Sequence, residues 1–182
     1  MNSTPRCNAW MLDTSTFIHV VMIGRISLLC SLRKQLYFPE YVYRYELGVE
    51  AKEKTRYEAE KCVNENRIAI QQLTLSDLEK IAQLNPPRRI GLGEIACVML
   101  AIRHAGGVLC DDRRAKNWLV PRLGEILWES IEEFLLSAAE DWHISEYQLD
   151  EFDQILLNNR YTCSFRLREE HLVRMHNKFL QT

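Results

Sequence analysis

The chain has 182 residues, of which 47% are hydrophobic and 26% are charged. This composition is typical of a soluble protein with a sizeable core and excludes a disordered chain. The formal net charge of −2 gives no overall basic excess of the kind that nucleic-acid binders usually carry. The longest apolar stretch, residues 17–32, is interrupted by His19, Arg25 and Ser27, so it predicts neither a membrane span nor a signal peptide and favours a cytoplasmic protein.

Short apolar runs alternate with helical patterns along the first 110 residues. Four runs predict strands, at residues 10–12, 36–38, 67–74 and 108–110. The helices predicted between them lie at residues 14–32, 39–61, 76–84 and 93–105. Their starting signals are the hydroxyls of residues 14–16, Pro39 in a first turn, and a capping box at residues 76–79. This alternation predicts an α/β fold, a parallel sheet of four to five short strands flanked by helices.

Beyond Pro121 the pattern changes to helices alone. Three amphipathic helices are predicted, at residues 125–141, 145–157 and 165–180. No linker rich in Gly or Ser separates them from the preceding part of the chain. We therefore predict a single domain over residues 1–182, with a core at about 9–120 and a C-terminal helical extension at about 121–182 that packs on it.

Cysteines and histidines give no sign of a metal site. The six cysteines lack the paired spacing of zinc sites and of thioredoxin-like motifs, so we predict reduced and mostly buried thiols. They are Cys7, Cys30, Cys62, Cys97, Cys110 and Cys163. The five histidines show no ligand pattern and are expected to be incidental.

Carboxylates stand where predicted strands end or predicted helices begin. They are Asp13, Glu46, Glu94 and the pair Asp111 and Asp112. A helix from residue 93 and the strand that returns from it bring Glu94 and the Asp pair to one edge, and the carboxyl ends of parallel strands are where ligands usually bind. Converging carboxylates repel one another unless cations lie between them. The sequence therefore predicts a site for Mg²⁺ or Mn²⁺, which prefer oxygen ligands, and metal-assisted cleavage of phosphodiesters.

Structural roles remain alternatives for several of these acids. Glu46 could pair with Arg44 or Lys52 on a solvated face. Glu94, in a first helical turn, could complement the helix dipole. The Asp pair could cap the following helix, a role that is compatible with metal binding.

Charge is distributed unevenly along the chain. Residues 86–122 contain seven basic and three acidic residues, whereas residues 125–153 contain ten acidic residues and no Lys or Arg. Arg113, Arg114 and Lys116 are therefore candidate phosphate contacts beside the carboxylates. A solvated helix face is the alternative for each of them.

Four segments around these acids resemble the PIN domain, the fold of metal-dependent ribonucleases that includes the VapC-type toxins of bacterial toxin–antitoxin pairs. The segments are residues 12–15 (Leu-Asp-Thr-Ser), 42–47 (Val-Tyr-Arg-Tyr-Glu-Leu), 92–96 (Leu-Gly-Glu-Ile-Ala) and 109–116 (Leu-Cys-Asp-Asp-Arg-Arg-Ala-Lys). Each is weak alone, but their order, spacing and setting agree over residues 9–120. The Gly-Glu version at residues 93 and 94 is similar to one sub-group of the family.

The resemblance implies particular roles for the matching residues. The catalytic residues would be Asp13, Glu46, Glu94 and Asp112. The metal ligands would be Asp13, Glu94 and one of the Asp pair, with Asp112 favoured over Asp111. Thr14 or Ser15 would orient the site. Two departures are Glu94, where many members have Asp, and Cys110, where many have Thr or Ser; the thiol is a poorer hydrogen-bond partner.

The resemblance also implies a function and partners. We expect a Mg²⁺- or Mn²⁺-dependent endoribonuclease that acts on RNA, is the toxin of a toxin–antitoxin pair, and is held inactive by a small antitoxin protein lying across the carboxylates. PIN domains often pair, so a homodimer through the tail helices is an option. One alternative is a PIN-fold binding or regulatory module with weak catalysis, using the acidic helices as a contact surface. Another is a DNA-directed nuclease with the same site.

Overall fold

The computed structural model describes residues 9–180, and its centre is a five-stranded sheet in which every neighbouring pair is parallel. The strand order is β3-β2-β1-β4-β5. The strands are β1 (Trp10–Leu12), β2 (Leu36–Pro39), β3 (Ile68–Gln71), β4 (Gly107–Leu109) and β5 (Leu127–Glu129). The predicted α/β fold with a parallel sheet and flanking helices is confirmed.

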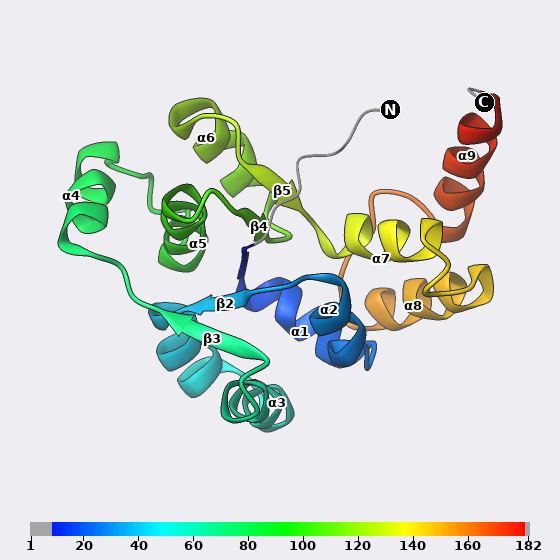
Figure 1. Cartoon of the computed structure of the whole chain (residues 1–182), viewed down its shortest axis with the longest axis horizontal. Coiled ribbons are helices and arrows are strands. Elements are labelled where there is room, and N and C mark those ends of the chain that lie inside the picture. Colours follow the sequence, from blue (N-terminus) through cyan, green and yellow to red (C-terminus); the bar gives the residue numbers. More distant parts are fainter. Residues whose placement is uncertain (1–8, 181–182) are drawn as a thin grey trace.

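Helices connect the strands and form the tail. In chain order they are α1 (Thr14–Met22), α2 (Ile26–Leu32), the π-helix η1 (Val42–Glu50), α3 (Glu53–Asn64), α4 (Leu75–Leu84), α5 (Leu92–Arg103), α6 (Arg113–Leu123), α7 (Ile131–Glu140), α8 (Glu146–Asn158) and α9 (Leu167–Leu180). Figure 1 shows α4, α5 and α6 on one side of the strands and α1, α2 and α3 on the other. The tail helices α7, α8 and α9 lie together at one end of the sheet (Figure 1).

The core is built between the sheet and these helices. The two central strands β1 and β4 are fully buried, as their uninterrupted apolar sequences require when helices cover both faces. Phe17 of α1 and Phe38 of β2 pack edge to face with ring centroids 5.0 Å apart. The five cysteines in residues 9–180 are free thiols, as predicted, and Cys7 lies outside the described residues.

Two predicted helices are divided in the structure. The predicted helix over residues 14–32 is broken between α1 and α2, where Gly24 adopts a left-handed φ of 68°. The predicted helix over residues 39–61 is instead η1 followed by α3, and Pro39 ends β2 rather than beginning a helix. The predicted capping box was also misplaced, because Thr74 is the N-cap of α4 and exchanges hydrogen bonds with Asp77.

The prediction of one helix over residues 125–141 was wrong at its start. Residues 127–129 form β5 beside β4, and α7 begins at Ile131 with Ser130 as its N-cap. The tail helices pack on the sheet domain, since α7 and α8 both contact α1. Arg174 links α9 to α7, because its guanidinium donates hydrogen bonds to Glu133 of α7 and also to Glu170 of α9 itself.

Candidate functional site

The candidate site lies at the carboxyl edge of the sheet, where β1 separates two sets of crossovers. β1 pairs with β2 on one side and with β4 on the other. In a doubly wound sheet, such a switch point leaves a crevice that commonly binds ligands. Asp13 directly follows β1, and its N–H donates to Leu109 of β4 at 3.0 Å. Asp111 and Asp112 follow β4, so the strand ends bring three predicted acids to one place.

Asp13 is a buried carboxylate at the N-terminus of α1. Only 3% of its surface is exposed, and its Oδ2 accepts hydrogen bonds from the N–H and the hydroxyl of Ser15, at 3.1 and 2.6 Å. Burial raises the pKa of Asp13, and the charge of Asp111 adds to this, while the Ser15 hydrogen bonds oppose it. The helix cap is therefore Asp13 and not one of the predicted hydroxyls, and Ser15 orients the acid.

Glu46 reaches the same place from η1. Wide π-helical turns are rare and often occur at functional sites. The Thr14 hydroxyl donates a hydrogen bond to Glu46 Oε2. The carboxylate rests against Gly93, where an added Cβ would lie 2.5 Å from Oε1. Burial raises the pKa of Glu46, with further contributions from the charges of Asp13 and Glu50, against the Thr14 hydrogen bond.

Glu94 lies in the first turn of α5, beside both acids. Its carboxylate folds back over Gly91, where a side chain would overlap it. Burial, followed by the charges of Asp13, Glu46 and Asp112, raises the pKa of Glu94 to about 7. Because each of these charges acts on Glu94, the structure brings together four acids that lie far apart in the sequence. The pairing of Glu46 with Arg44 is not formed, since Arg44 donates to Glu40 at 2.7 Å.

The two neighbouring aspartates have different partners. Asp111 accepts a hydrogen bond from the N–H of Ile131 at 2.7 Å and lies 2.7 Å from His19 Nδ1. Asp112 is the N-cap of α6, and its Oδ1 accepts from the N–H groups of Arg114 and Ala115. Asp111 thus contacts both α1 and α7, and its charge acts on Asp13, whereas the charge of Asp112 acts on Glu94. The choice between them as a metal ligand stays a prediction.

The acidic cluster matches a divalent ion in donor type but not in arrangement. Within residues 9–180, no three Asp, Glu, His or Cys side chains are arranged so that they could hold a metal ion. The donor chemistry does suit one, because the cluster offers carboxylate oxygens, and a cation would offset both the burial and the neighbouring negative charges that raise the pKa of Glu94. The residues therefore fit Mg²⁺ or Mn²⁺ by donor type, and enclosing an ion requires their side chains to rotate.

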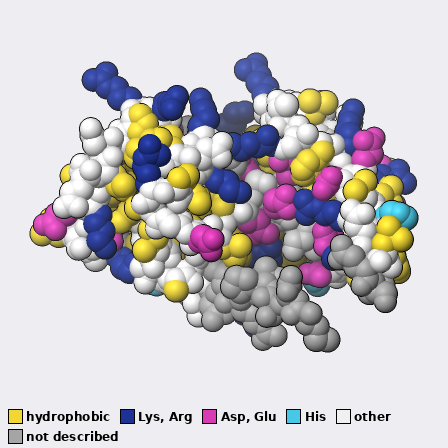
Figure 2. All heavy atoms as spheres, turned by 90° about the horizontal axis from the view of Figure 1, so that it is seen from above, with side chains coloured by type: hydrophobic (Ala, Val, Ile, Leu, Met, Phe, Trp, Pro, Cys, Tyr) yellow, Lys and Arg dark blue, Asp and Glu magenta, His cyan; other side chains and the backbone are white. Residues whose placement is uncertain are grey.

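Beside the cluster lies an open cleft of about 690 Å³. Its wall includes Ser15, Glu94, Asp111, Asp112, Arg113 and Arg114, of which Arg114 has a 75% exposed side chain. Arg113 is paired with Glu132 at 3.2 Å. Lys116 lies instead in a neighbouring pocket and does not line this cleft. On the face seen in Figure 2, acidic side chains gather towards the middle, and Lys and Arg side chains lie around them.

Another part of the wall comes from the tail and was not predicted. Asn159, Arg160, Tyr161 and Thr162, in the loop after α8, line the cleft. His19 lines it as well, with its ring 4.5 Å from that of Tyr161, so it is not the incidental residue that the sequence suggested. Arg160 forms no ion pair with any residue in the described part of the chain. A loop residue carries no periodic signal, so this wall could not be found without the packing of α8.

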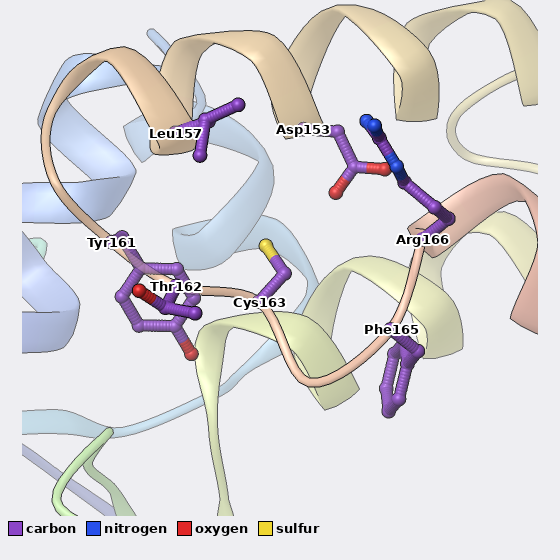
Figure 3. A pocket seen from close by; sticks show the side chains of 7 residues that line it. All are labelled: Asp153, Leu157, Tyr161, Thr162, Cys163, Phe165 and Arg166. Atoms are coloured by element: carbon purple, nitrogen blue, oxygen red, sulfur yellow. The ribbon is translucent and has the colours of Figure 1, made fainter.

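A smaller pocket of about 330 Å³ lies behind this wall and shares Tyr161 and Thr162 with the cleft (Figure 3). Asp153 caps α9 there, accepting a hydrogen bond from the N–H of Leu167 at 2.9 Å. Burial and the nearby charge of Asp153 raise the pKa of the Cys163 thiol to about 12. Figure 3 shows the Asp153 carboxylate and the Cys163 sulfur turned toward the same space. These contacts hold the loop that forms the cleft wall.

The fold and the acidic edge define a class of α/β protein with a carboxylate-lined crevice at its switch point. Residues 9–121 match the family model DUF3368, described as a PIN domain, and the chain belongs to the PIN domain family. The resemblance in the four segments is thereby confirmed. PIN domains have a nuclease-type fold and generally use divalent metal ions. The tail after residue 121 lies beyond the matched part.

Two further findings concern relatives and membranes. A search of curated proteins found none that matches the chain. Between residues 9 and 180, no helix has both the length and the apolar character needed to cross a bilayer.

Proposed function

We propose that this protein is a metal-dependent endoribonuclease that hydrolyses phosphodiester bonds of RNA in the cytoplasm, and that it is the toxin of a bacterial toxin–antitoxin pair. The observation that carries the proposal is the clustering of Asp13, Glu46, Glu94 and Asp112 at the switch point, where burial, followed by the charges of the other three acids, raises the pKa of Glu94 to about 7. A pocket of repelling carboxylates is costly unless a cation or a proton offsets the charge. The family generally uses divalent ions, which supports the cation.

The acids and the arginines of the cleft have different roles in the proposed reaction. Asp13, Glu94 and Asp112 would hold Mg²⁺ or Mn²⁺. When bound, the ion supplies a nucleophilic water near neutral pH and offsets the charge that develops on the phosphate. Ser15 fixes the Asp13 carboxylate and Thr14 fixes that of Glu46, so two of the four acids are already oriented. Arg114 and Arg160, which both line the cleft, would bind the phosphates on either side.

A cleavage assay tests the proposal. Purified protein is incubated with single-stranded RNA and with DNA of the same sequence, in Mn²⁺ or with EDTA. We expect RNA cleavage in Mn²⁺, none with EDTA, and a loss of at least ~100-fold in Asp13→Asn. Asp141→Asn, an exposed change outside the cleft, is the matched control. Preference for DNA would favour the DNA-directed alternative, and activity that survives both EDTA and Asp13→Asn would refute the proposal.

The toxin role has its own test. The wild-type chain and Asp13→Asn are each expressed in bacteria from an inducible promoter, with protein levels matched. We expect growth arrest with the wild type only, because uncontrolled RNA cleavage requires the intact acids. A small antitoxin protein inserted across the cleft would prevent both RNA binding and growth arrest. Normal growth with the active wild-type nuclease would argue against the toxin role.

One observation favours a second candidate, a PIN-fold binding or regulatory module with weak catalysis. In residues 9–180 the acids are not arranged to hold an ion as they stand. If the protein is such a module, it will bind RNA or a partner protein but will cleave neither RNA nor DNA in Mn²⁺ or Mg²⁺. The cleavage assay therefore separates the two candidates.

A further inference from the structure

A further pocket opens at the same edge of the sheet, beyond the ends of β2 and β3. Its volume is about 320 Å³, within the range of pockets that bind small organic groups. Pro39 at the end of β2 and Leu73 after β3 contribute to its floor, and Leu78 of α4 lies on one side. Tyr41 and Tyr45 also line it. Since these residues follow strands, the pocket belongs to the edge that carries the acids.

The pocket presents aromatic rings to solvent. The rings of Tyr41 and Tyr45 lie 5.4 Å apart and are tilted by 30°, and Tyr45 is 58% exposed. Arg44, also in the lining, pairs with Glu40 at 2.7 Å, so the acid there is neutralised. Exposed aromatic rings beside apolar side chains and a guanidinium suit a flat aromatic group, because stacking covers the rings without requiring hydrogen bonds.

The position of the pocket relative to the acids is set by two helices. Tyr45 directly precedes Glu46 in η1. Ala96 of α5 also lines the pocket, and it lies one helical turn from Gly93, against which the Glu46 carboxylate rests. One turn of a helix advances ~5.4 Å, and neighbouring strands lie ~4.8 Å apart. The pocket is therefore one or two strands from Asp13 on the β2 side, and the arginine-bearing cleft begins on the β4 side.

We propose that this pocket binds a nucleobase of a single-stranded RNA substrate, next to the phosphodiester that lies at the acids. The inference rests on the proposed function and specifies its substrate as single-stranded. Arginines, acids and aromatic pocket follow one another along the sheet edge, which is the order of parts that a strand of phosphates and splayed bases requires. In a duplex the bases are stacked inside and cannot enter the pocket.

Fluorescence anisotropy with a labelled single-stranded oligoribonucleotide tests the inference. EDTA is present so that the RNA stays intact, and the measurement is repeated with Mg²⁺. We expect Tyr45→Ala to weaken binding ~10-fold and Tyr45→Phe to stay within ~2-fold of the wild type. Tyr57→Ala is the matched control, because Tyr57 is 61% exposed on α3 and does not line the pocket. A set of oligonucleotides with one abasic position each then locates the bound base.

Four outcomes are decisive. For one abasic position, the wild type and Tyr45→Ala should bind equally, because the base that Tyr45 stacks on is missing. Equal binding of intact RNA by the wild type and Tyr45→Ala would overturn the inference. The occupant of the pocket would then be a side chain of a partner protein. Equal losses in Tyr45→Ala and Tyr57→Ala would also overturn it. If the wild type binds no RNA with either EDTA or Mg²⁺, the proposed function itself fails.

Discussion

The Glu46 carboxylate lies against the backbone of Gly93, and this contact joins the π-helix to the first turn of α5. It exists because Gly93 has no side chain, since a Cβ at that position would lie 2.5 Å from Oε1 and 2.9 Å from Oε2. Glu94, the next residue, is thereby held beside Glu46. The pair Gly93 and Glu94 therefore contributes to the site twice. Gly93 leaves space for the Glu46 carboxylate, and Glu94 supplies a second carboxylate.

Gly93→Ala should therefore separate activity from stability. The methyl group displaces the Glu46 carboxylate, so we expect RNA cleavage to fall at least ~10-fold. The free energy of unfolding should stay level or rise by up to ~1 kcal/mol, because alanine favours a helix over glycine and the displaced group is the end of a flexible side chain. Cleavage rates and urea unfolding measure the two effects. Full activity in Gly93→Ala would show that the position of Glu46 is unimportant.

Two threonines of α1 form a matched pair. Thr14 donates to Glu46, whereas the Thr16 hydroxyl is buried and has no hydrogen-bond partner in the described residues. We expect Thr14→Val to lower RNA cleavage ~10-fold and Thr14→Ser to restore it. Thr16→Val should keep activity and hold or raise stability by up to ~1 kcal/mol, because it removes an unsatisfied polar group. Equal activities of the two valine variants would contradict the role given to Thr14.

The pKa of Glu94 predicts how the stability of the metal-free protein depends on pH. The folded value is about 7, against an ordinary value of 4.5 in the unfolded chain. Between these values the folded state binds more protons than the unfolded state, so stability falls as pH rises from about 4.5 to 7. The pKa values of Asp13 and Glu46 are also raised, so they act in the same direction.

Thermal unfolding with EDTA at pH 5, 6, 7 and 8 checks this sign. We expect the wild type to lose on the order of 1–2 kcal/mol relative to Glu94→Gln across the range, after allowing for solvent screening of a half-buried group. Added Mn²⁺ should offset the loss, because a cation bound to the folded state stabilises it. A difference between the two proteins that does not change with pH would contradict the shifted pKa of Glu94.

The sequence was sufficient for the parts of this architecture that rest on local patterns. The apolar runs of β1 and β4 are short and fully buried, so the acids after them, Asp13 and Asp111, could be placed at the strand ends. The same reasoning placed Glu94 in a first helical turn. It could not show that Asp111 contacts His19 of α1, because that contact joins residues 92 positions apart in the sequence.

The missed features depend on contacts between distant segments. The strand β5 has only three residues, and its Glu129 is buried against Arg33, which donates to it at 2.8 Å. An amphipathic helix starting near residue 125 accounted equally well for the local pattern. The cleft wall at Arg160 and Tyr161 depends on the docking of α8 against α1, which no spacing in the sequence specifies.

Arg160 provides the last prediction, a test of the tail as part of the substrate cleft. Arg160 is exposed, lines the same cleft as Arg114, and has no ion-pair partner in residues 9–180. We expect Arg160→Ala to raise the KM for RNA ~5- to 10-fold with little change in kcat, and to reduce the salt dependence of binding by about one ion per RNA. Arg166→Ala, a matched change in the pocket behind the wall, should leave the salt dependence unchanged. An unchanged KM in Arg160→Ala would mean that the RNA makes no contact with Arg160, and the tail would then have no part in substrate binding.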